Sequence, residues 1–218
     1  MAETFLPQLG YRKRAHMMNT MLGSLIGGKM SSSDPPNTKI MFLDGPNTVR
    51  EKISGAYCEA GEIAKNGILP TLKQILIPIS ELRVERQKQG HSLSSDQKPF
   101  CSTNAPKGAV FSVELNTKDG GGCRHYKSYD EIEQEFGQKK LDPVALKEAV
   151  AEALNQLLAP IRSSYRENKA WQEVDKVAYP GEIAMSDWEG SGRETSCGLR
   201  GIVGDFISVG IRSMTYWD

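Results

Sequence analysis

The sequence has no excess of charge of either sign, because 27 lysine and arginine residues are balanced by 27 aspartate and glutamate residues. A chain without net charge has no overall positive field of the kind that drives sequence-independent binding to nucleic acid. Any contact with RNA must therefore depend on a local group of cations. At 218 residues the chain is long enough for one substantial domain or two small ones.

Paired cysteines and long apolar runs are also missing. Cys58, Cys101, Cys123 and Cys197 are widely scattered without Cys-x-x-Cys spacing, which argues against a zinc ribbon and against a disulfide framework. Reduced thiols in the cytosol are the simplest interpretation. No apolar stretch reaches the roughly 18 residues of a transmembrane helix, and the start has no run of signal-peptide length. We therefore expect a soluble, cytoplasmic protein.

Helix signals are present at several places. Thr48 followed by Glu51 is a capping-box pattern that predicts the start of a helix, with Val49, Ile53 and Tyr57 on one side. A second helix is predicted over 67–77, closed by Pro78.

The second half of the chain has clearer patterns. Ser128 with Glu131 is another capping box, and Asp142 with Pro143 predicts the start of a long helix. Residues of that helix recur on one face at helical spacing; they are Leu146, Val150, Ala153, Leu157 and Ile161.

Between these helices the sequence predicts a hairpin and a loop. Residues 110–115 alternate like a strand, 118–122 form a glycine-rich turn, and 124–127 can return antiparallel. Residues 83–107 are polar without a helical or strand period, and we interpret them as an exposed inserted loop. After Pro180 lysine is absent and neither period persists, so the tail, 181–218, looks unlike the rest.

One short motif points to chemistry. Lys29-Met30-Ser31-Ser32-Ser33 follows two glycines, and it resembles the Lys-Met-Ser-Lys-Ser signature of class I aminoacyl-tRNA synthetases. Its surroundings resemble the tyrosyl-tRNA synthetases of eukaryotes and archaea, in the same order along the chain, up to about Pro180. These surroundings are Tyr11 to Asn19, Asn66 to Leu69, Val110 to Val113, Tyr126 to Tyr129 and Leu154 to Arg162.

The resemblance implies a fold and a division into domains. It implies an α/β remnant of a Rossmann-type catalytic domain over 1–45, carrying the signature loop. A mainly α-helical, anticodon-binding-like domain with a small β-hairpin would follow over 46–180, with the insertion at 83–107, and 181–218 would be a divergent tail. A tryptophanyl synthetase carries a related loop, but 11–19 and 126–136 favour the tyrosyl branch.

The resemblance also implies roles for individual residues. Lys29, Ser31 and Ser32 would be catalytic, because an ammonium and hydroxyls stabilise the charge on pyrophosphate as tyrosine attacks ATP. Ser32 stands where the wider family has a second lysine. Mg²⁺ would accompany ATP, with no separate metal site.

Further residues would line the ATP site by the same resemblance. His16, Met17, Met18 and Met30 would join Lys29 there. The alternatives remain open, because methionines often fill gaps in a core and a lone histidine is more often a structural hydrogen-bonding group.

Some expected features of the family are absent from these 218 residues. No His-x-Gly-His string occurs, so activation by this chain alone is doubtful, and tyrosine would bind only in a complete enzyme. Gly120 and Ala145 stand where an aromatic and an acidic residue often contact the anticodon. Family members are homodimers, but the resemblance does not carry that state over to this chain.

tRNA-Tyr is the implied RNA partner. Lys118, Arg124 and Lys127 would contact its phosphates, although such a cluster is more often a solvated face. A non-catalytic module that binds tRNA or another protein is the competing hypothesis.

Overall fold

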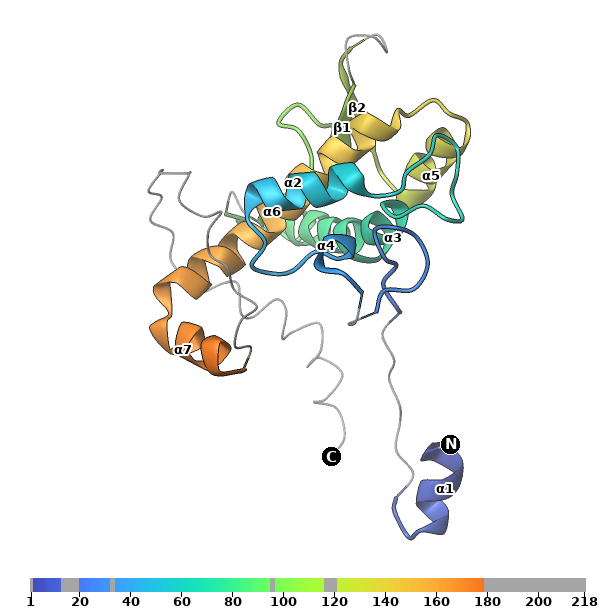
Figure 1. Cartoon of the computed structure of the whole chain (residues 1–218). Coiled ribbons are helices and arrows are strands. Elements are labelled where there is room, and N and C mark those ends of the chain that lie inside the picture. The colour runs from blue at the N-terminus through green and yellow to red at the C-terminus, as the bar shows by residue number, and fades with distance from the viewer. Residues whose placement is uncertain (1, 13–19, 32–33, 95–96, 116–120, 179–218) are drawn as a thin grey trace.

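The computed structural model describes residues 2–12, 20–31, 34–94, 97–115 and 121–178. Within them the protein is mainly helical, with one two-stranded sheet (Figure 1). None of the described helices is long and apolar enough to cross a bilayer. The elements are α1 (Ala2–Gln8), the 3₁₀ turn η1 (Pro36–Thr38), α2 (Pro46–Gly55), α3 (Leu69–Thr71), the π-helical turn η2 (Leu72–Leu76), α4 (Ile77–Lys88), β1 (Phe111–Glu114), β2 (Cys123–Tyr126), α5 (Tyr129–Gly137), α6 (Pro143–Glu167) and α7 (Lys169–Ala178).

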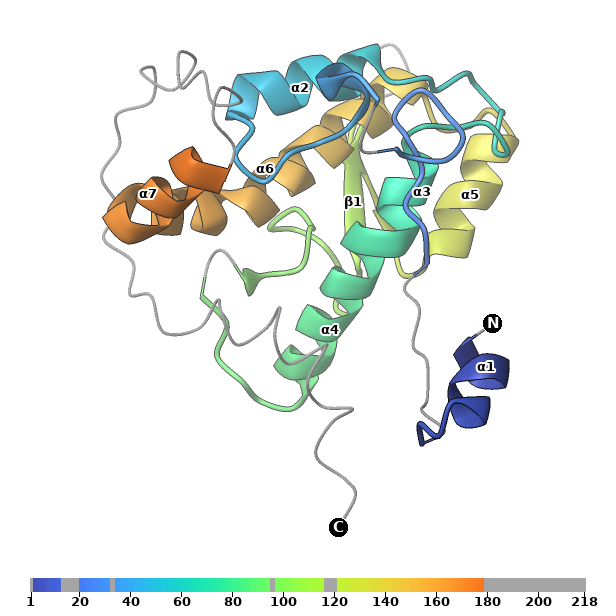
Figure 2. The ribbon, with the colours of Figure 1, turned by 60° about the horizontal axis from the view of Figure 1, so that its bottom comes forward.

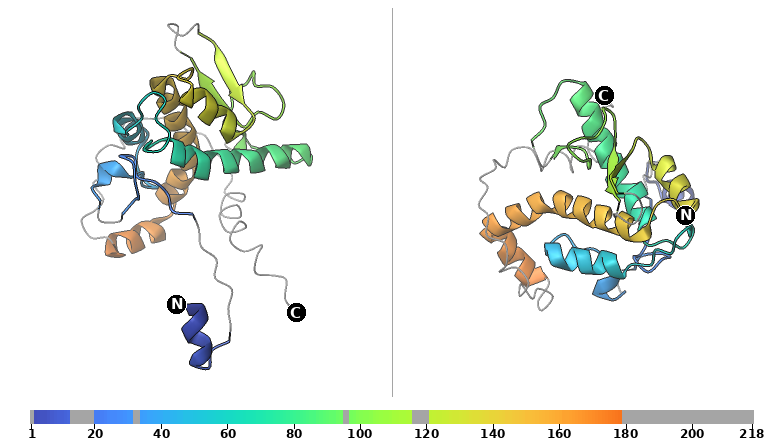
Figure 3. Two further views of the ribbon diagram at one scale, coloured as in Figure 1. Left: turned by 90° about the vertical axis from the view of Figure 1, so that its right-hand side faces the viewer. Right: turned by 90° about the horizontal axis from the view of Figure 1, so that it is seen from above.

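Helices α2 and α6 lie side by side and antiparallel (Figure 3). The Lys147 ammonium near the start of α6 donates to the carbonyl of Ser54 near the end of α2, at 2.7 Å. Further along, the Asn155 amide donates to the carbonyl of Pro46, the first residue of α2, at 3.2 Å. The apolar faces of both helices are buried in one core, so this pair fixes the centre of the helical body.

The predicted start of the long helix is confirmed. Asp142 is the N-cap of α6, and its carboxylate accepts from the backbone N–H groups of Val144 and Ala145, at 3.0 Å each. Proline at the first helical position needs no N–H partner and has a suitable φ. The predicted cap of α5 is also confirmed, because the Ser128 hydroxyl accepts from Glu131 N–H.

The start of α2 differs from the prediction. The helix begins at Pro46, not at Thr48, because proline takes the first helical position after Gly45. Val49 and Ile53 are buried as expected. Tyr57 lies beyond the helix, which ends at Gly55, and is 40% exposed, so its predicted place on the helix beside Val49 and Ile53 is wrong.

The predicted end of the second helix at Pro78 is wrong. Elements α3, η2 and α4 form one helical segment from Leu69 to Lys88 (Figure 2). Pro78 has no N–H for a helical bond, and an ordinary turn would bring its ring against the backbone. The π-turn directly before it, where Ile77 N–H reaches back to the Leu72 carbonyl, widens the helix and allows it to continue.

The prediction of an exposed loop over 83–107 is wrong at two places. Residues 83–88 belong to α4. Phe100 is 4% exposed and forms an isolated parallel bridge with Phe111 at the start of β1. The Arg83 guanidinium lies over the Phe100 ring, 4.6 Å from its centroid. Phe100 thus packs the otherwise polar segment that contains it against the core.

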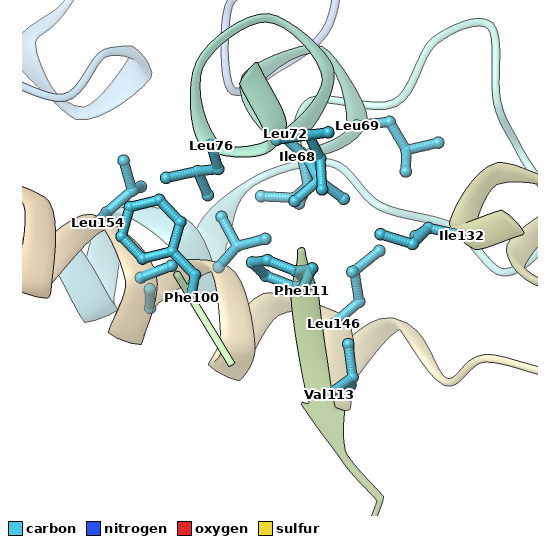
Figure 4. Close-up of a cluster of buried hydrophobic side chains, with 14 of the residues drawn as sticks. Ile68, Leu69, Leu72, Leu76, Phe100, Phe111, Val113, Ile132, Leu146 and Leu154 are labelled. Carbon is cyan, nitrogen blue, oxygen red and sulfur yellow. The ribbon is translucent and has the colours of Figure 1, made fainter. Parts of the chain in front are cut away.

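The predicted hairpin is confirmed. β1 and β2 are antiparallel, with Phe111 opposite Tyr126 and Glu114 opposite Cys123. Phe111 and Val113 face the core, where side chains from α3, η2, α5 and α6 surround them (Figure 4). Lys118 and Gly120 in the predicted turn lie outside the described residues.

The α/β remnant predicted for 1–45 is not confirmed. In the described part of this range the structure has α1, η1 and an isolated antiparallel bridge between Gly23 and Lys29. Residues 13–19 of this range lie outside the described residues, as does the tail from 179 onward. Helix α1 lies apart from the helical body (Figure 1).

Candidate functional site

The residues before and including Lys29 form a tight hairpin, Gly23–Lys29, which we call the signature hairpin. Its ends pair through the Gly23–Lys29 bridge, and Ser24 N–H donates to the Gly28 carbonyl at 3.0 Å. Gly27 and Gly28 have φ of +85° and +81°, a region that side chains with a Cβ rarely adopt. The two glycines therefore allow the chain to reverse just before Lys29.

The signature hairpin presents Lys29 to solvent. Lys29 is exposed, and its ammonium makes no ion pair with any residue that the structure describes. Met30 is 37% exposed. Ser31 begins the next turn, since its N–H donates to the Asp34 carboxylate at 2.9 Å and its carbonyl accepts from Asp34 N–H at 3.2 Å. Lys29 is thus available to an anionic ligand.

Several predicted site residues cannot be placed beside Lys29. His16, Met17, Met18 and Ser32 lie outside the described residues. The structure therefore brings together Lys29, Met30 and Ser31 only.

The turn of the signature hairpin is buried at Leu25. Leu25 is 3% exposed, its N–H donates to the Thr38 carbonyl at 3.0 Å, and its carbonyl accepts from Tyr57 N–H at 2.8 Å. Thr38 belongs to η1 and Tyr57 to the connection between α2 and α3. The turn of the signature hairpin is therefore bonded to the helical body, and Lys29 stands at its open end.

Of the predicted RNA-binding cations, Arg124 is already engaged. Its guanidinium donates to Glu135 at 2.7 Å and to the Lys140 carbonyl at 3.2 Å. The hydrogen bond to Glu135 is the largest cause that raises the pKa of Arg124. Tyr126 donates to the same carboxylate at 2.8 Å. Arg124 thus serves the packing of β2 against α5.

Lys127 is exposed at the end of the hairpin. Its backbone N–H donates to the Glu131 carboxylate at 2.7 Å. Lys118 lies outside the described residues. Of the two described cations, Arg124 and Lys127, Lys127 is therefore the more accessible to RNA.

A cavity of about 680 Å³, which the sequence did not indicate, lies between α2, α6, β1 and residues 100–102. Ala145, which is 1% exposed, forms part of its wall. The alternation of β1 could have indicated a polar face here, because Ser112 and Glu114 point away from the side that buries Phe111 and Val113. Charged groups from both helices also line it; they are Arg50, Lys147, Glu148 and Glu152.

Comparison with known proteins places this geometry in a family. Residues 1–159 match the family described as tRNA synthetases class I (W and Y). A protein named tyrosine–tRNA ligase, cytoplasmic, from Saccharomyces cerevisiae is 40% identical over 181 residues, which are 83% of this chain and 40% of that protein. The protein of that name from Gallus gallus is 34% identical over 180 residues, 82% of this chain and 28% of its own length.

Solved structures agree. The tyrosyl-tRNA synthetase of Aeropyrum pernix superposes with a TM-score of 0.58 at 25% identity, covering 81% of this chain and 43% of that chain. The synthetase of Archaeoglobus fulgidus, solved with L-tyrosine, gives 0.54 at 32% identity, covering 74% and 41%. The chain thus spans less than half the length of these relatives.

Proposed function

This chain belongs to the class I tRNA synthetases (W and Y), and we propose that it forms part of a tyrosine–tRNA ligase of the eukaryotic and archaeal type. The ligase would activate tyrosine with ATP and transfer it to tRNA-Tyr in the cytoplasm. The names of the Saccharomyces cerevisiae and Gallus gallus relatives support tyrosine over tryptophan. The observation that carries the proposal is the exposed Lys29 on a glycine hairpin whose turn is buried at Leu25.

The proposed chemistry is displacement at the α-phosphate of ATP. An oxygen of the tyrosine carboxylate bonds to the α-phosphorus as the bond to pyrophosphate breaks, and the leaving pyrophosphate gains negative charge. The Lys29 ammonium and the hydroxyls of Ser31 and Ser32 stabilise that charge. The glycines that precede Lys29 allow the segment that carries it to close over the phosphates and to open again.

Mg²⁺ would accompany ATP at this site. In the described ranges, no group of three or more His, Cys, Asp or Glu residues is arranged to hold a metal ion. Mg²⁺ is commonly held by substrate phosphates and water with few protein carboxylates. When bound it would neutralise phosphate charge, while Lys29 supplies the fixed cation of the protein.

The remaining site residues are part of the same proposal. His16, Met17, Met18 and Met30 would border the nucleotide, and the catalytic part would occupy 1–45 as the end of a Rossmann-type domain. The helical part, 46–180, would bind tRNA. Lys118 and Lys127 would contact its phosphates, and Arg124 would do so only by leaving Glu135.

A second candidate is a non-catalytic module that binds tRNA or a protein. The cavity beside α6 is the site that such a module would use, because its lining cations, Arg50 and Lys147, and its carboxylates, Glu114, Glu148 and Glu152, lie on the helical body and do not depend on Lys29. In that case substitution of Lys29 would leave binding unchanged, whereas loss of Lys147 would weaken it.

Completion of the enzyme tests the first candidate. The part of the Saccharomyces cerevisiae relative that precedes the matched region is joined to this chain, and tyrosine-dependent ATP–pyrophosphate exchange is measured. We expect exchange, reduced about 10²-fold or more by Lys29→Ala because a preorganised charge partner is lost. Exchange that is insensitive to Lys29→Ala would exclude the catalytic role of this residue.

A further inference from the structure

A series of backbone hydrogen bonds joins four segments of the chain at the turn of the signature hairpin. Leu25 N–H donates to the Thr38 carbonyl at 3.0 Å, Tyr57 N–H to the Leu25 carbonyl at 2.8 Å, and Gly67 N–H to the Tyr57 carbonyl at 2.7 Å. Leu25 thus uses both of its backbone groups. The series joins η1, the hairpin and both ends of the connection between α2 and α3.

The hairpin and this connection approach so closely that only glycine fits. A Cβ on Gly67 would lie 1.9 Å from the Leu25 carbonyl oxygen, far inside van der Waals contact. A Cβ on Gly27 would lie 2.7 Å from the Lys65 carbonyl oxygen. Two backbone contacts, one from each side, therefore depend on the absence of a side chain.

Asn66 fixes the position of Gly67. It is 2% exposed, and its side-chain oxygen accepts from the N–H groups of Ile68 and Leu69 at 2.8 and 3.0 Å. Its amide nitrogen donates to the Glu62 carbonyl at 3.1 Å. Because α3 begins at Leu69 in the core, the surface that receives Leu25 is a rigid part of the helical body.

We propose that Gly67 is a positioning residue that holds Leu25, and through it Lys29, in a fixed place on the helical body. Leu25 is then a fixed point in the turn of the signature hairpin, and movement of Lys29 takes place beyond Gly27, from Gly28 onward. The role of Gly67 in catalysis rests on the proposed function. The attachment of Leu25 to the helical body at Gly67 does not.

Hydrogen exchange of the 218-residue chain tests the attachment without any ligand. Gly67→Ala is compared with Gly55→Ala, since a Cβ on Gly55 meets nothing within 4 Å. We expect exchange of the Leu25 and Tyr57 amides to accelerate about tenfold or more in Gly67→Ala, because their bonds open locally. Gly55→Ala should exchange as the unchanged chain does, and equal protection in Gly67→Ala would overturn the proposal.

A second pair of variants tests the same contact from the signature hairpin, where a substitution is less damaging to the fold as a whole. Gly27→Ala and Gly28→Ala introduce the same strain, since both glycines have positive φ, but a Cβ on Gly28 meets nothing within 4 Å. Faster exchange at Tyr57 in Gly27→Ala alone supports the attachment. Equal acceleration in both would assign the effect to strain and contradict it.

Kinetics of the completed enzyme separate positioning from mere stability. With Gly67→Ala we expect kcat of tyrosine-dependent exchange to fall about tenfold or more while KM for tyrosine changes little, since Lys29 acts on the leaving group. Unchanged kcat in the presence of faster amide exchange would overturn the positioning role. If the completed parent enzyme shows no exchange activity, the proposed function fails, and amide exchange alone decides the attachment.

Discussion

Lys52 and Asp44 form an ion pair at 2.7 Å whose side chains are 11% and 12% exposed. The Asp44 carboxylate also accepts from Met41 N–H at 2.8 Å. Removal of one partner from such a pair leaves a poorly solvated charge behind. The pair therefore matters to the segment that connects the signature hairpin to α2.

Asp44→Asn should lower the free energy of unfolding by about 3 kcal/mol, because it leaves the Lys52 ammonium without its counter-charge. Urea denaturation measures the effect. Glu152→Gln is the matched control, since its ion pair with Arg50 has side chains 54% and 72% exposed, and it should change stability by less than about 1 kcal/mol. Equal losses in the two variants would contradict this account.

The thiols of Cys58 and Cys101 should react slowly with iodoacetamide. Burial raises the pKa of both, so less of the reactive thiolate is present at a given pH than for an exposed cysteine. We expect alkylation at pH 8 to be slower than in the urea-unfolded chain and to accelerate as pH rises. Mass spectrometry of labelled peptides gives the rates, and labelling of Cys58 at the unfolded rate would refute the prediction.

Among the elements, α6 depends on its cap. Asp142→Ala should reduce stability by about 1 kcal/mol, because the N–H groups of Val144 and Ala145 lose their acceptor. Thermal unfolding measures the loss. Glu148→Ala, at an exposed position of the same helix, should stay within about 0.5 kcal/mol of the parent chain. A similar shift in both variants would mean that the cap contributes little.

Phe100 should behave as a core residue despite its polar surroundings. Phe100→Ala should cost about 3–5 kcal/mol, the range for truncation of a buried aromatic side chain. Chemical denaturation gives the value. Exposed Leu82 on α4 provides the control, since Leu82→Ala should cost far less stability. If Phe100→Ala cost less stability than this control, the residues around Phe100 would not be packed on the core.

The elements also show which parts of the fold a single sequence can predict. Asp142 and Ser128 marked helix starts correctly, because a cap is a local interaction between a side chain and nearby N–H groups. Pro78 misled, since the π-turn that accommodates it depends on packing of the whole segment. Phe100 was missed because one buried aromatic leaves no periodic pattern.

At the scale of the whole molecule, the motif that contains Lys29 was predictable from the sequence, but the contacts that hold it in place were not. Lys29 follows from five consecutive residues, whereas the contact between Leu25 and Gly67 joins positions 42 apart and has no local signature. The surface around the signature hairpin is notably apolar. Its exposed large side chains include Met21, Ile26, Met41 and Phe42.

The central claim is that Lys29 on its fixed hairpin receives the phosphates of ATP. Isothermal titration of the 218-residue chain with ATP and Mg²⁺ tests it, alongside Lys29→Ala and the control Lys169→Ala on α7. We predict saturable binding that Lys29→Ala weakens about tenfold or more through loss of a charge-assisted contact, and that Lys169→Ala leaves intact. Binding that is equal in all three proteins, or absent from the parent chain, would contradict the claim.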